Sequence, residues 1–342
     1  MVVRRLSVGP PGRREQVPCR EQARIGIVRR SAGAAAAAGR ESELTTMRYR
    51  QTLAAEATVE GIGLHSGEKV RMRLLPAEAG SGVVFVRADA GDVEIPATLE
   101  YAGPSFYATV LRRGDLTVST IEHLMAALYA LLVDDVRVEL DGGEVPILDG
   151  SSLPFVDLLL KAGRAPHDVV REYISLVRPV VVSQEDKRIA AYPCREYRVT
   201  YAIDFDHPVL GYQELSTTLW GEGAFAGKLA PARTFTFEND VKKLRDSGLA
   251  LGGSLENAVV LGEQGPLNPG LRYEDEFVRH KMLDLTGDLS LLGHPLRAHI
   301  VAYRAGHDLH ARLARRIWDA RDSWHLAPWD EASSGVEPAA GA

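Results

Sequence analysis

The strongest constraint on the fold comes from residues 277–293, whose sequence is FVRHKMLDLTGDLSLLG. Four of the apolar residues recur at intervals of three and four: Val278, Met282, Leu285 and Leu289. This spacing predicts a helix that packs one face against a protein core. His280, Asp284 and Asp288 repeat every four residues and therefore share another face of the same helix. The segment thus predicts a core helix that presents one imidazole and two carboxylates together.

The polar face of this helix has two interpretations. Histidine and aspartate are natural zinc ligands, so His280 and Asp284 could hold a divalent cation from one helix. A histidine and an aspartate four residues apart also occur by chance, and a polar stripe on a helix is usually solvated. The helix alone is therefore weak evidence for a metal site.

A second histidine lies in the motif STIEHLM. Ser119 and Glu122 match a capping box, which gives the glutamate a purely structural interpretation. His123 has apolar neighbours, so a hydrogen-bonded core histidine is the alternative to a ligand. Together with His280 and Asp284 it would form a His2Asp set, and catalytic zinc usually has three protein ligands and a water. Glu122 could then accept a proton from that water.

Two further residues are candidates for the chemistry. His307 follows a glycine after the apolar segment 298–303, which predicts a strand end or a tight loop. It is either a surface histidine or a general acid that a carboxylate such as Asp288 keeps charged. Thr234 lies in the motif ARTFTF, which could be a plain edge strand or could place a hydroxyl near an oxyanion.

Charge and cysteine content exclude several classes of function. The net charge is −6 at pH 7 and there is no basic stripe, so nucleic acid is not an expected partner. No apolar run in the sequence approaches the ~20 residues that span a bilayer, so the chain is not expected to be transmembrane. Cys19 and Cys194 form no CxxC pair, which argues against a thiolate metal site and favours a reducing, cytoplasmic location.

Strand-like and helix-like segments follow one another in two similar halves, which predicts an α+β fold with two similar domains, residues 47–165 and 172–320. The first half has predicted strands and helices at residues 70–74, 82–86, 120–132, 136–140 and 154–162. The second half has them at residues 174–182, 188–192, 197–205, 238–246 and around His280. Residues 163–171, which are polar and contain a proline, form the predicted linker.

Two tails differ from this body. Residues 1–46 hold nine arginines, four glutamates and a Gly/Ala run, a composition that also suits a transit peptide. We expect instead a disordered extension, or a segment upstream of a true start at Met47. The acidic residues 331–342 are expected to be a flexible tail.

Eight motifs together resemble one family, the UDP-3-O-acyl-N-acetylglucosamine deacetylases, which are zinc enzymes of lipid A biosynthesis. In chain order they are GIGLHSG (61–67), STIEHLMAAL (119–128), EVPILDGSSLPF (144–155), DFDHPVLGYQ (204–213), ARTFTF (232–237), LALGGSLENAVV (249–260), LRYEDEFVRHKMLDLTGDLSLLGH (271–294) and AYRAGHDLHARL (302–313). The resemblance runs from about residue 49 to residue 317 and is far more specific than any single motif.

The resemblance implies a metal site and a base. It implies that His123, His280 and Asp284 bind zinc (Zn2+), with Glu122 as the general base. Iron (Fe2+) could replace zinc, because two histidines and one carboxylate with open positions also suit that ion.

The resemblance also implies roles around the substrate. His307 falls on the general acid, Asp288 on the carboxylate that orients it, and Thr234 on the hydroxyl that supports the oxyanion. Lys281 matches a lysine near the polar head of the substrate, and Phe235 matches an aromatic residue near the glucosamine.

For the fold, the resemblance implies helices sandwiched between the sheets of two α+β domains, with the active site at the domain junction. An inserted βαβ segment, here around residues 235–260, is expected to form a passage for the acyl chain. Four apolar residues suit that passage: Leu244, Leu249, Leu251 and Leu255.

The chain departs from the family pattern at three places. Arg304 stands where lysine is common and keeps the positive charge of a phosphate contact with a different geometry. His310 stands where asparagine is usual, and no role is assigned to it. Residues 107–113 lack a cysteine that is often present near the pocket.

The expected function is therefore the zinc-dependent removal of the N-acetyl group from UDP-3-O-(3-hydroxyacyl)-N-acetylglucosamine, the committed step of lipid A biosynthesis. The products are acetate and UDP-3-O-(3-hydroxyacyl)-glucosamine. The acylated UDP-amino sugar is the expected partner of a monomeric enzyme. Two alternatives stay open, namely a zinc amidase acting on another acylated amino sugar and a non-catalytic relative that binds a sugar nucleotide. A structural zinc site usually has four Cys or His ligands, which disfavours that class.

Overall fold

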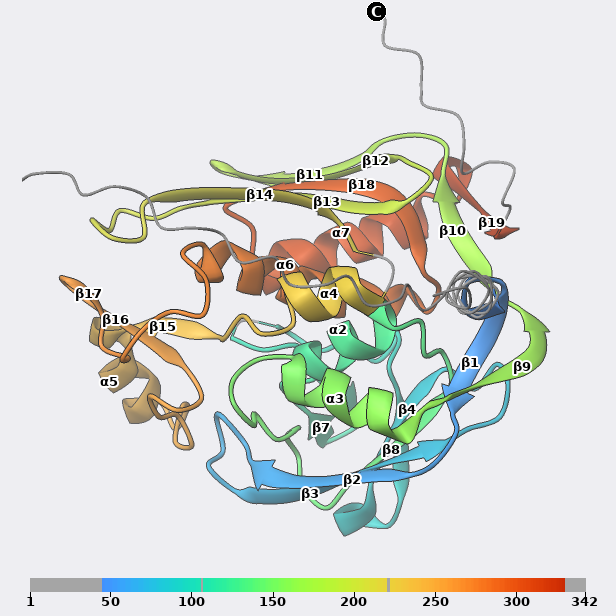
Figure 1. Ribbon diagram of the computed structural model, residues 1–342, viewed down its shortest axis with the longest axis horizontal. Helices are drawn as coiled ribbons and strands as arrows, with labels where there is room; N and C mark the ends of the chain where they lie inside the picture. Colours follow the sequence, from blue (N-terminus) through green and yellow to red (C-terminus); the bar gives the residue numbers. More distant parts are fainter. Residues whose placement is uncertain (1–44, 106, 220–221, 330–342) are drawn as a thin grey trace, which may run out of the picture. The chain divides into compact units, whose positions relative to one another are not determined.

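The computed structural model describes residues 45–105, 107–219 and 222–329, in which helices lie between two sheets (Figure 1). The combination of several sheets with helices confirms the predicted α+β class. The predicted tails fall outside the described residues, except for Thr45 and Thr46. None of the described helices is long and apolar enough to cross a membrane.

The first sheet has the strand order β2–β3–β8–β4–β5 among the described residues. Its strands are β2 (Ala57–Ile62), β3 (Lys69–Pro76), β4 (Val83–Arg87), β5 (Val93–Pro96) and β8 (Val136–Leu140). Along β3 the buried residues Val70, Met72 and Leu74 alternate with more exposed ones, so one face of the strand is buried. Helices α2 (Glu122–Ala130) and α3 (Leu153–Ala162) cover that face (Figure 1).

The second sheet has β18 at its centre, antiparallel to β12 and parallel to β13. Its described strands are β10 (Glu172–Leu176), β11 (Val180–Gln184), β12 (Lys187–Pro193), β13 (Tyr197–Asp204), β14 (Tyr212–Thr218), β18 (Leu296–Tyr303) and β19 (Trp324–Pro328). Helices α6 (Glu276–Leu289) and α7 (His307–Asp319) lie on the side that faces the first sheet (Figure 1). The chain passes from β18 into α7 through residues 304–306.

The two layers meet where α2 packs against α6. Every residue of α2 and nearly every residue of α6 is buried. A methyl group added at Gly287 would lie 2.1 Å from the Glu122 carbonyl oxygen, so this approach requires glycine. Because His280, Asp284 and Asp288 are all buried, the polar face of α6 points into protein. The alternative of a solvated stripe is wrong.

The predicted linker 163–171 is mostly a strand, β9 (Arg164–Val170), which pairs antiparallel with β1 (Tyr49–Leu53). Polar residues and Pro166 suggested a loop, but an edge strand tolerates both. The pairing also satisfies backbone groups that a loop would leave to water.

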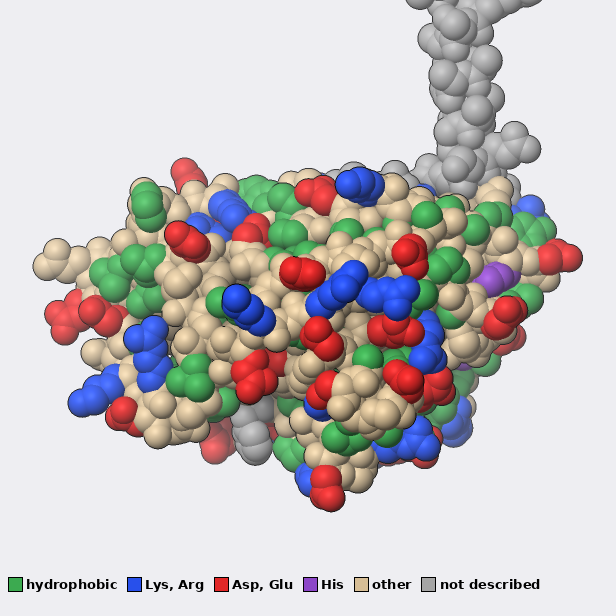
Figure 2. All heavy atoms as spheres, turned by 90° about the horizontal axis from the view of Figure 1, so that it is seen from below, with side chains coloured by type: hydrophobic (Ala, Val, Ile, Leu, Met, Phe, Trp, Pro, Cys, Tyr) green, Lys and Arg blue, Asp and Glu red, His purple; other side chains and the backbone are tan. Residues whose placement is uncertain are grey.

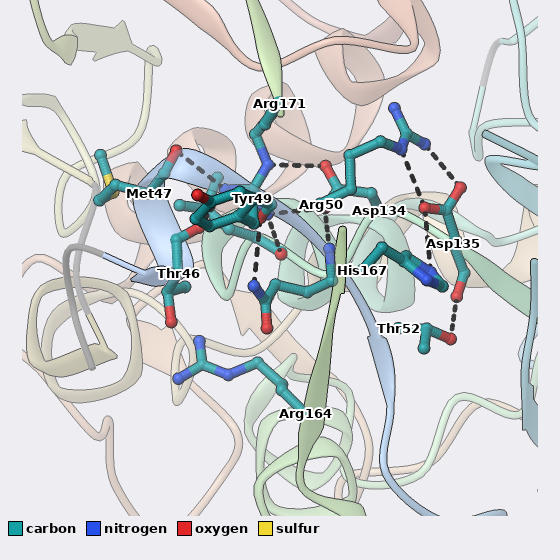
Figure 3. Close-up of polar contacts among 12 residues, drawn as sticks. Thr46, Met47, Tyr49, Arg50, Thr52, Asp134, Asp135, Arg164, His167 and Arg171 are labelled. Atoms are coloured by element: carbon teal, nitrogen blue, oxygen red, sulfur yellow. Dashed lines mark hydrogen bonds and ion pairs between the residues drawn. The ribbon is translucent and has the colours of Figure 1, made fainter. Parts of the chain in front are cut away.

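Ion pairs connect the β1–β9 ribbon to Asp134 and Asp135, which lie between α2 and β8 (Figure 3). The guanidinium of Arg171 donates to both carboxylate oxygens of Asp134, at 2.8 and 2.6 Å, and to the Leu132 carbonyl at 2.8 Å. The guanidinium of Arg50 donates to Asp135 at 2.9 and 2.6 Å. Buried charges are tolerated when they are paired in this way.

Residues 235–260 contain a βαβ arrangement. Strand β15 (Phe235–Phe237) is parallel to β16 (Val259–Gly262), and α5 (Glu238–Asp246) connects them. Strand β17 (Gly265–Pro266) extends this sheet. The remaining described elements include α4 (Glu222–Lys228) and the hairpin β6 (Leu111–Arg113) and β7 (Leu116–Val118).

Two predicted elements differ most from the observed ones. The helix predicted at residues 120–132 spans only Glu122–Ala130. The strand predicted at residues 174–182 is divided into β10 and β11, because Pro179 lacks the N–H that a continuous ladder needs.

Acidic and basic side chains are interspersed over the face shown in Figure 2, so positive charge is not concentrated there.

Candidate active site

Helix α2 begins with the two candidate residues Glu122 and His123, both of which are buried. The capping-box interpretation is wrong, because this helix has no side-chain cap and Ser119 Oγ donates to the Gly143 carbonyl at 3.3 Å. Thr120 has a φ of 59°, in the left-handed region, which turns the chain sharply before the helix. The Glu122 carboxylate is therefore left for other partners.

Helix α6 places His280 and Asp284 beside His123, and we call these three residues the His123 trio. Asp284 Oδ1 lies 3.2 Å from His280 Nε2 and 3.7 Å from His123 Nε2. Ligands of a tetrahedral zinc ion, each bonded at ~2.0–2.2 Å, lie about 3.3–3.6 Å apart. The trio therefore has the spacing of a zinc-type ligand set.

The chemistry of the His123 trio also fits a cation. His280 Nδ1 lies 3.1 Å from the Ala232 carbonyl, so it carries the hydrogen and leaves the Nε2 lone pair available. Burial lowers the pKa of His123 to about 3 and also lowers the pKa of His280, which favours neutral, ligating imidazoles. Among the described residues, no hydrogen-bond donor reaches the buried Asp284 Oδ1. Burial opposes ionisation of Asp284, but His280 and Lys281 outweigh it and hold this pKa below its usual range.

One turn further along α6, Asp288 contacts two histidines of α7, and we call Asp288, His307 and His310 the His307 trio. Asp288 Oδ2 lies 2.8 Å from His307 Nδ1 and 2.7 Å from His310 Nδ1. Asp288 Oδ1 accepts a short hydrogen bond from the Thr109 hydroxyl. Both oxygens of this carboxylate thus already have donors, unlike Asp284 Oδ1.

The two trios adjoin, because His307 Nε2 lies 3.9 Å from Asp284 Oδ2. Burial acts to lower the pKa of His307, but the Asp288 carboxylate outweighs it and raises this pKa to about 9. Burial raises the pKa of Glu122 to about 7, and His307 opposes that rise. Between these two values a protonated imidazole and an ionised carboxylate coexist, as an acid and a base must.

Sequence reasoning missed the involvement of Thr109 and His310. Thr109 donates its backbone N–H to Glu122 Oε2 at 2.9 Å and its hydroxyl to Asp288. It therefore bridges the candidate base and the carboxylate of the candidate acid. His310 could have been found, because it lies three residues after His307 on the same helix face. Thr109 comes from a loop and has no spacing signal.

Two of the predicted substrate contacts lie beside the His123 trio. The Phe235 ring is 6.3 Å from the His280 ring and 5.6 Å from Lys281 Nζ. Lys281 Nζ donates to Asp284 Oδ2 at 2.8 Å. Lys281 and Phe235 therefore adjoin the His123 trio, and their contact with a substrate stays a prediction.

Thr234 and Arg304, the other two residues predicted to act on the substrate, do not share one location. Thr234 precedes β15 and lines the groove beside the trio, with its backbone N–H bonded to the Gly150 carbonyl at 2.8 Å. Arg304 has a φ of 53° and forms a solvent-accessible ion pair with Asp186 at 2.5 Å. The structure therefore does not bring the Arg304 guanidinium to either trio.

A groove of about 870 Å³ extends from Thr234 and Phe235 along α5. Its apolar lining includes Leu244, Leu249 and Leu255, whereas Leu251 lies outside the lining and is 53% exposed. Three of the four leucines predicted for a passage therefore line one groove next to the candidate site.

Comparison with known proteins connects this geometry to one family. Residues 50–319 match the family model described as UDP-3-O-acyl N-acetylglycosamine deacetylase. The UDP-3-O-acyl-N-acetylglucosamine deacetylase of Syntrophotalea carbinolica is 45% identical over 290 residues, which cover 84% of this chain and 94% of that protein. The protein of the same name from Myxococcus xanthus is 46% identical, with 82% and 89% covered. That of Solibacter usitatus is 44% identical, with 86% and 99% covered.

Proposed function

The chain belongs to the family of UDP-3-O-acyl-N-acetylglucosamine deacetylases, and from this premise we propose that it hydrolyses the N-acetyl group of UDP-3-O-(3-hydroxyacyl)-N-acetylglucosamine in lipid A biosynthesis. The observation that carries the proposal is the adjacency of the two trios, with His307 Nε2 3.9 Å from Asp284 Oδ2. A ligand set beside a charged imidazole would supply both a Lewis acid and a general acid for amide hydrolysis.

In this proposal His123, His280 and Asp284 hold zinc. The bound ion supplies Lewis-acid chemistry, which makes water more acidic and polarises a carbonyl oxygen. Iron is the alternative occupant of the same ligand set.

The protein groups move the protons. Glu122 takes one proton from the water that attacks the acetamide carbonyl, and the Thr234 hydroxyl stabilises the oxyanion. His307, held by Asp288, donates its proton to the departing nitrogen, because an amide anion is a very poor leaving group. The C–N bond breaks, and the products are acetate and the free amine of the sugar.

The groove beside the site supports an acylated substrate. We assign the acyl chain to the leucine-lined wall and the sugar to Phe235, with Lys281 and Arg304 serving the polar head. Arg304 would have to leave Asp186 for this role. The proposed domains are residues 47–165 and 172–320, with the site at their junction.

The cellular setting is also part of the proposal. Both trios come from a single chain, so the proposed site needs no second subunit, and we propose a monomeric enzyme. The two sequence-separated cysteines support a cytoplasmic location.

The test is acetate release by the zinc-loaded protein from the acylated UDP-sugar and from the same nucleotide without its 3-O-acyl chain. We expect release from the acylated compound and a much slower reaction without the chain. Equal rates would favour an amidase for another amino sugar. Binding without any acetate release would favour the non-catalytic alternative.

A further inference from the structure

The Asp288 carboxylate serves two imidazoles rather than one. His307 Nδ1 and His310 Nδ1 both bond to the same oxygen, Oδ2, at 2.8 and 2.7 Å. His310 is fully buried, and among the described residues its imidazole nitrogens pair with Asp288 and Tyr201, neither of which belongs to the His123 trio. The proposed reaction does not use it, so a buried polar side chain of this kind needs another explanation.

The second nitrogen of His310 continues the hydrogen bonds back toward His307. The Tyr201 hydroxyl lies 3.0 Å from His310 Nε2 and 2.8 Å from the Ala305 carbonyl oxygen, and these two acceptors share its single hydrogen. Ala305 precedes His307 by two residues. The contacts therefore form a closed ring that runs from His307 through Asp288, His310 and Tyr201 to Ala305 and returns along the backbone.

The backbone segment inside this ring needs such support. Gly306 lies between Ala305 and His307, and a methyl group built on it would meet no atom within 4 Å. Side-chain packing at this glycine therefore does not fix the start of α7, and glycine adds backbone freedom. The ring restrains the position from both sides, through Ala305 and through Asp288.

We infer that His310 is a positioning residue, which with Tyr201 fixes Asp288 and the start of α7 so that His307 is aligned for proton donation. This inference rests on the proposed deacetylase function. Substrate does not touch His310 in this account. Its loss should therefore lower kcat and leave KM and metal content unchanged.

Side-chain geometry offers matched variants. The amide nitrogen of His310→Asn can occupy the place of Nδ1 and keep the bond to Asp288, but it cannot reach Tyr201. The amide of His310→Gln occupies the place of Nε2 and loses the bond to Asp288. Tyr201→Phe removes the outer bond, between His310 and Tyr201, together with the Tyr201–Ala305 bond, and it keeps the bond to Asp288. Leu309→Ala is the control, because Leu309 is a buried neighbour on α7 with an apolar side chain.

The kinetic experiment measures kcat, KM and zinc content for these variants on the acylated UDP-sugar. We expect His310→Ala and His310→Gln to lose about 10-fold in kcat, within the ~10²-fold that a displaced catalytic group can cost. We expect His310→Asn, Tyr201→Phe and their double variant to lose about 3-fold each, because all three break the same outer bond. Unchanged kcat in His310→Ala would overturn the inference. So would equal losses in His310→Asn and His310→Gln, or an equal loss in Leu309→Ala.

A second readout does not depend on activity. In zinc-loaded protein with 15N-labelled histidine, the His307 Nδ1–H proton should resonate at low field and exchange slowly with water. We expect faster exchange in His310→Ala and near-normal exchange in His310→Asn. Identical exchange in the two variants would overturn the positioning role. If the wild-type protein released no acetate, the proposed function would fail. The exchange measurement would still show whether His310 positions His307.

Discussion

The His123 trio and the His307 trio have the same composition, two histidines and one aspartate, and each takes its aspartate from α6. They differ in how the carboxylate is occupied. Asp284 Oδ1 has no hydrogen-bond partner among the described residues, whereas Asp288 accepts from two imidazoles and a hydroxyl. A carboxylate with a free lone pair suits a cation, and one saturated by donors suits the support of a charged imidazole. Residue types alone do not separate a metal site from an acid, but the hydrogen bonds do.

The largest effect is expected from removing a ligand of the His123 trio. His280→Ala should lose bound zinc and at least ~10³-fold in activity, because several kcal/mol of Lewis-acid stabilisation disappear. Elemental analysis of the purified variant measures the metal. His310→Ala, an equivalent change in the His307 trio, is the control and should keep its zinc. Zinc retained by His280→Ala but lost by His310→Ala would contradict this assignment of the two trios.

Changes to the proton-transfer groups should affect the rate without affecting the metal. Glu122→Ala and His307→Ala should each lower kcat by ~10²-fold or more while zinc content stays normal. Steady-state kinetics and metal analysis of the same samples test this. A variant with a near-normal rate would remove that residue from the mechanism.

Thr109 sharpens the comparison, because it reaches both the base and the acid. Thr109→Val keeps the shape and the backbone N–H to Glu122 but removes the hydroxyl from Asp288. We expect kcat to fall by about 10-fold, in line with ~1–2 kcal/mol for one buried hydrogen bond to a charged group. Thr109→Ser should restore most of the rate. If valine and serine gave equal rates, the hydroxyl would have no part in supporting His307.

The smallest expected effect is the dependence of kcat/KM on pH. The rate should rise as Glu122 ionises and fall as His307 loses its proton, which gives a bell-shaped profile of kcat/KM. The pKa values of about 7 and about 9 are upper limits for the two limbs, because a bound cation favours ionised Glu122 and neutral His307. His307→Ala should lose the descending limb. A descending limb that survives in this variant would assign it to another group.

Much of the fold was predictable where one physical pattern dominates. Helix α5 has the predicted bounds, and the apolar stripe of α6 is buried as expected. The enclosure of the polar face of α6 was not predictable, because it depends on the approach of α2 at Gly287. The β9 strand was missed because its pairing partner, β1, lies more than 100 residues away in the sequence.

In the candidate site, too, local patterns were predictable from the sequence and contacts between distant segments were not. The candidate ligands His280 and Asp284 could be named because a helix places residues four apart on one face, and the remaining candidate roles come from the family resemblance. The capping box at Ser119 failed, because the left-handed Thr120 interrupts the helix start and no local pattern indicates it. Thr109 has no sequence signal at all, because its role arises from a loop that meets both α2 and α6. The Arg304 ion pair with Asp186 depends on two segments that are distant in the chain.

The central claim is that the His123 trio holds the metal and the His307 trio handles the proton. An anomalous difference map, recorded at the zinc absorption edge from crystals of the zinc-loaded protein, tests this most directly. The account predicts one strong peak within bonding distance of His123 Nε2, His280 Nε2 and Asp284. A peak bound by Asp288, His307 and His310 instead would contradict it.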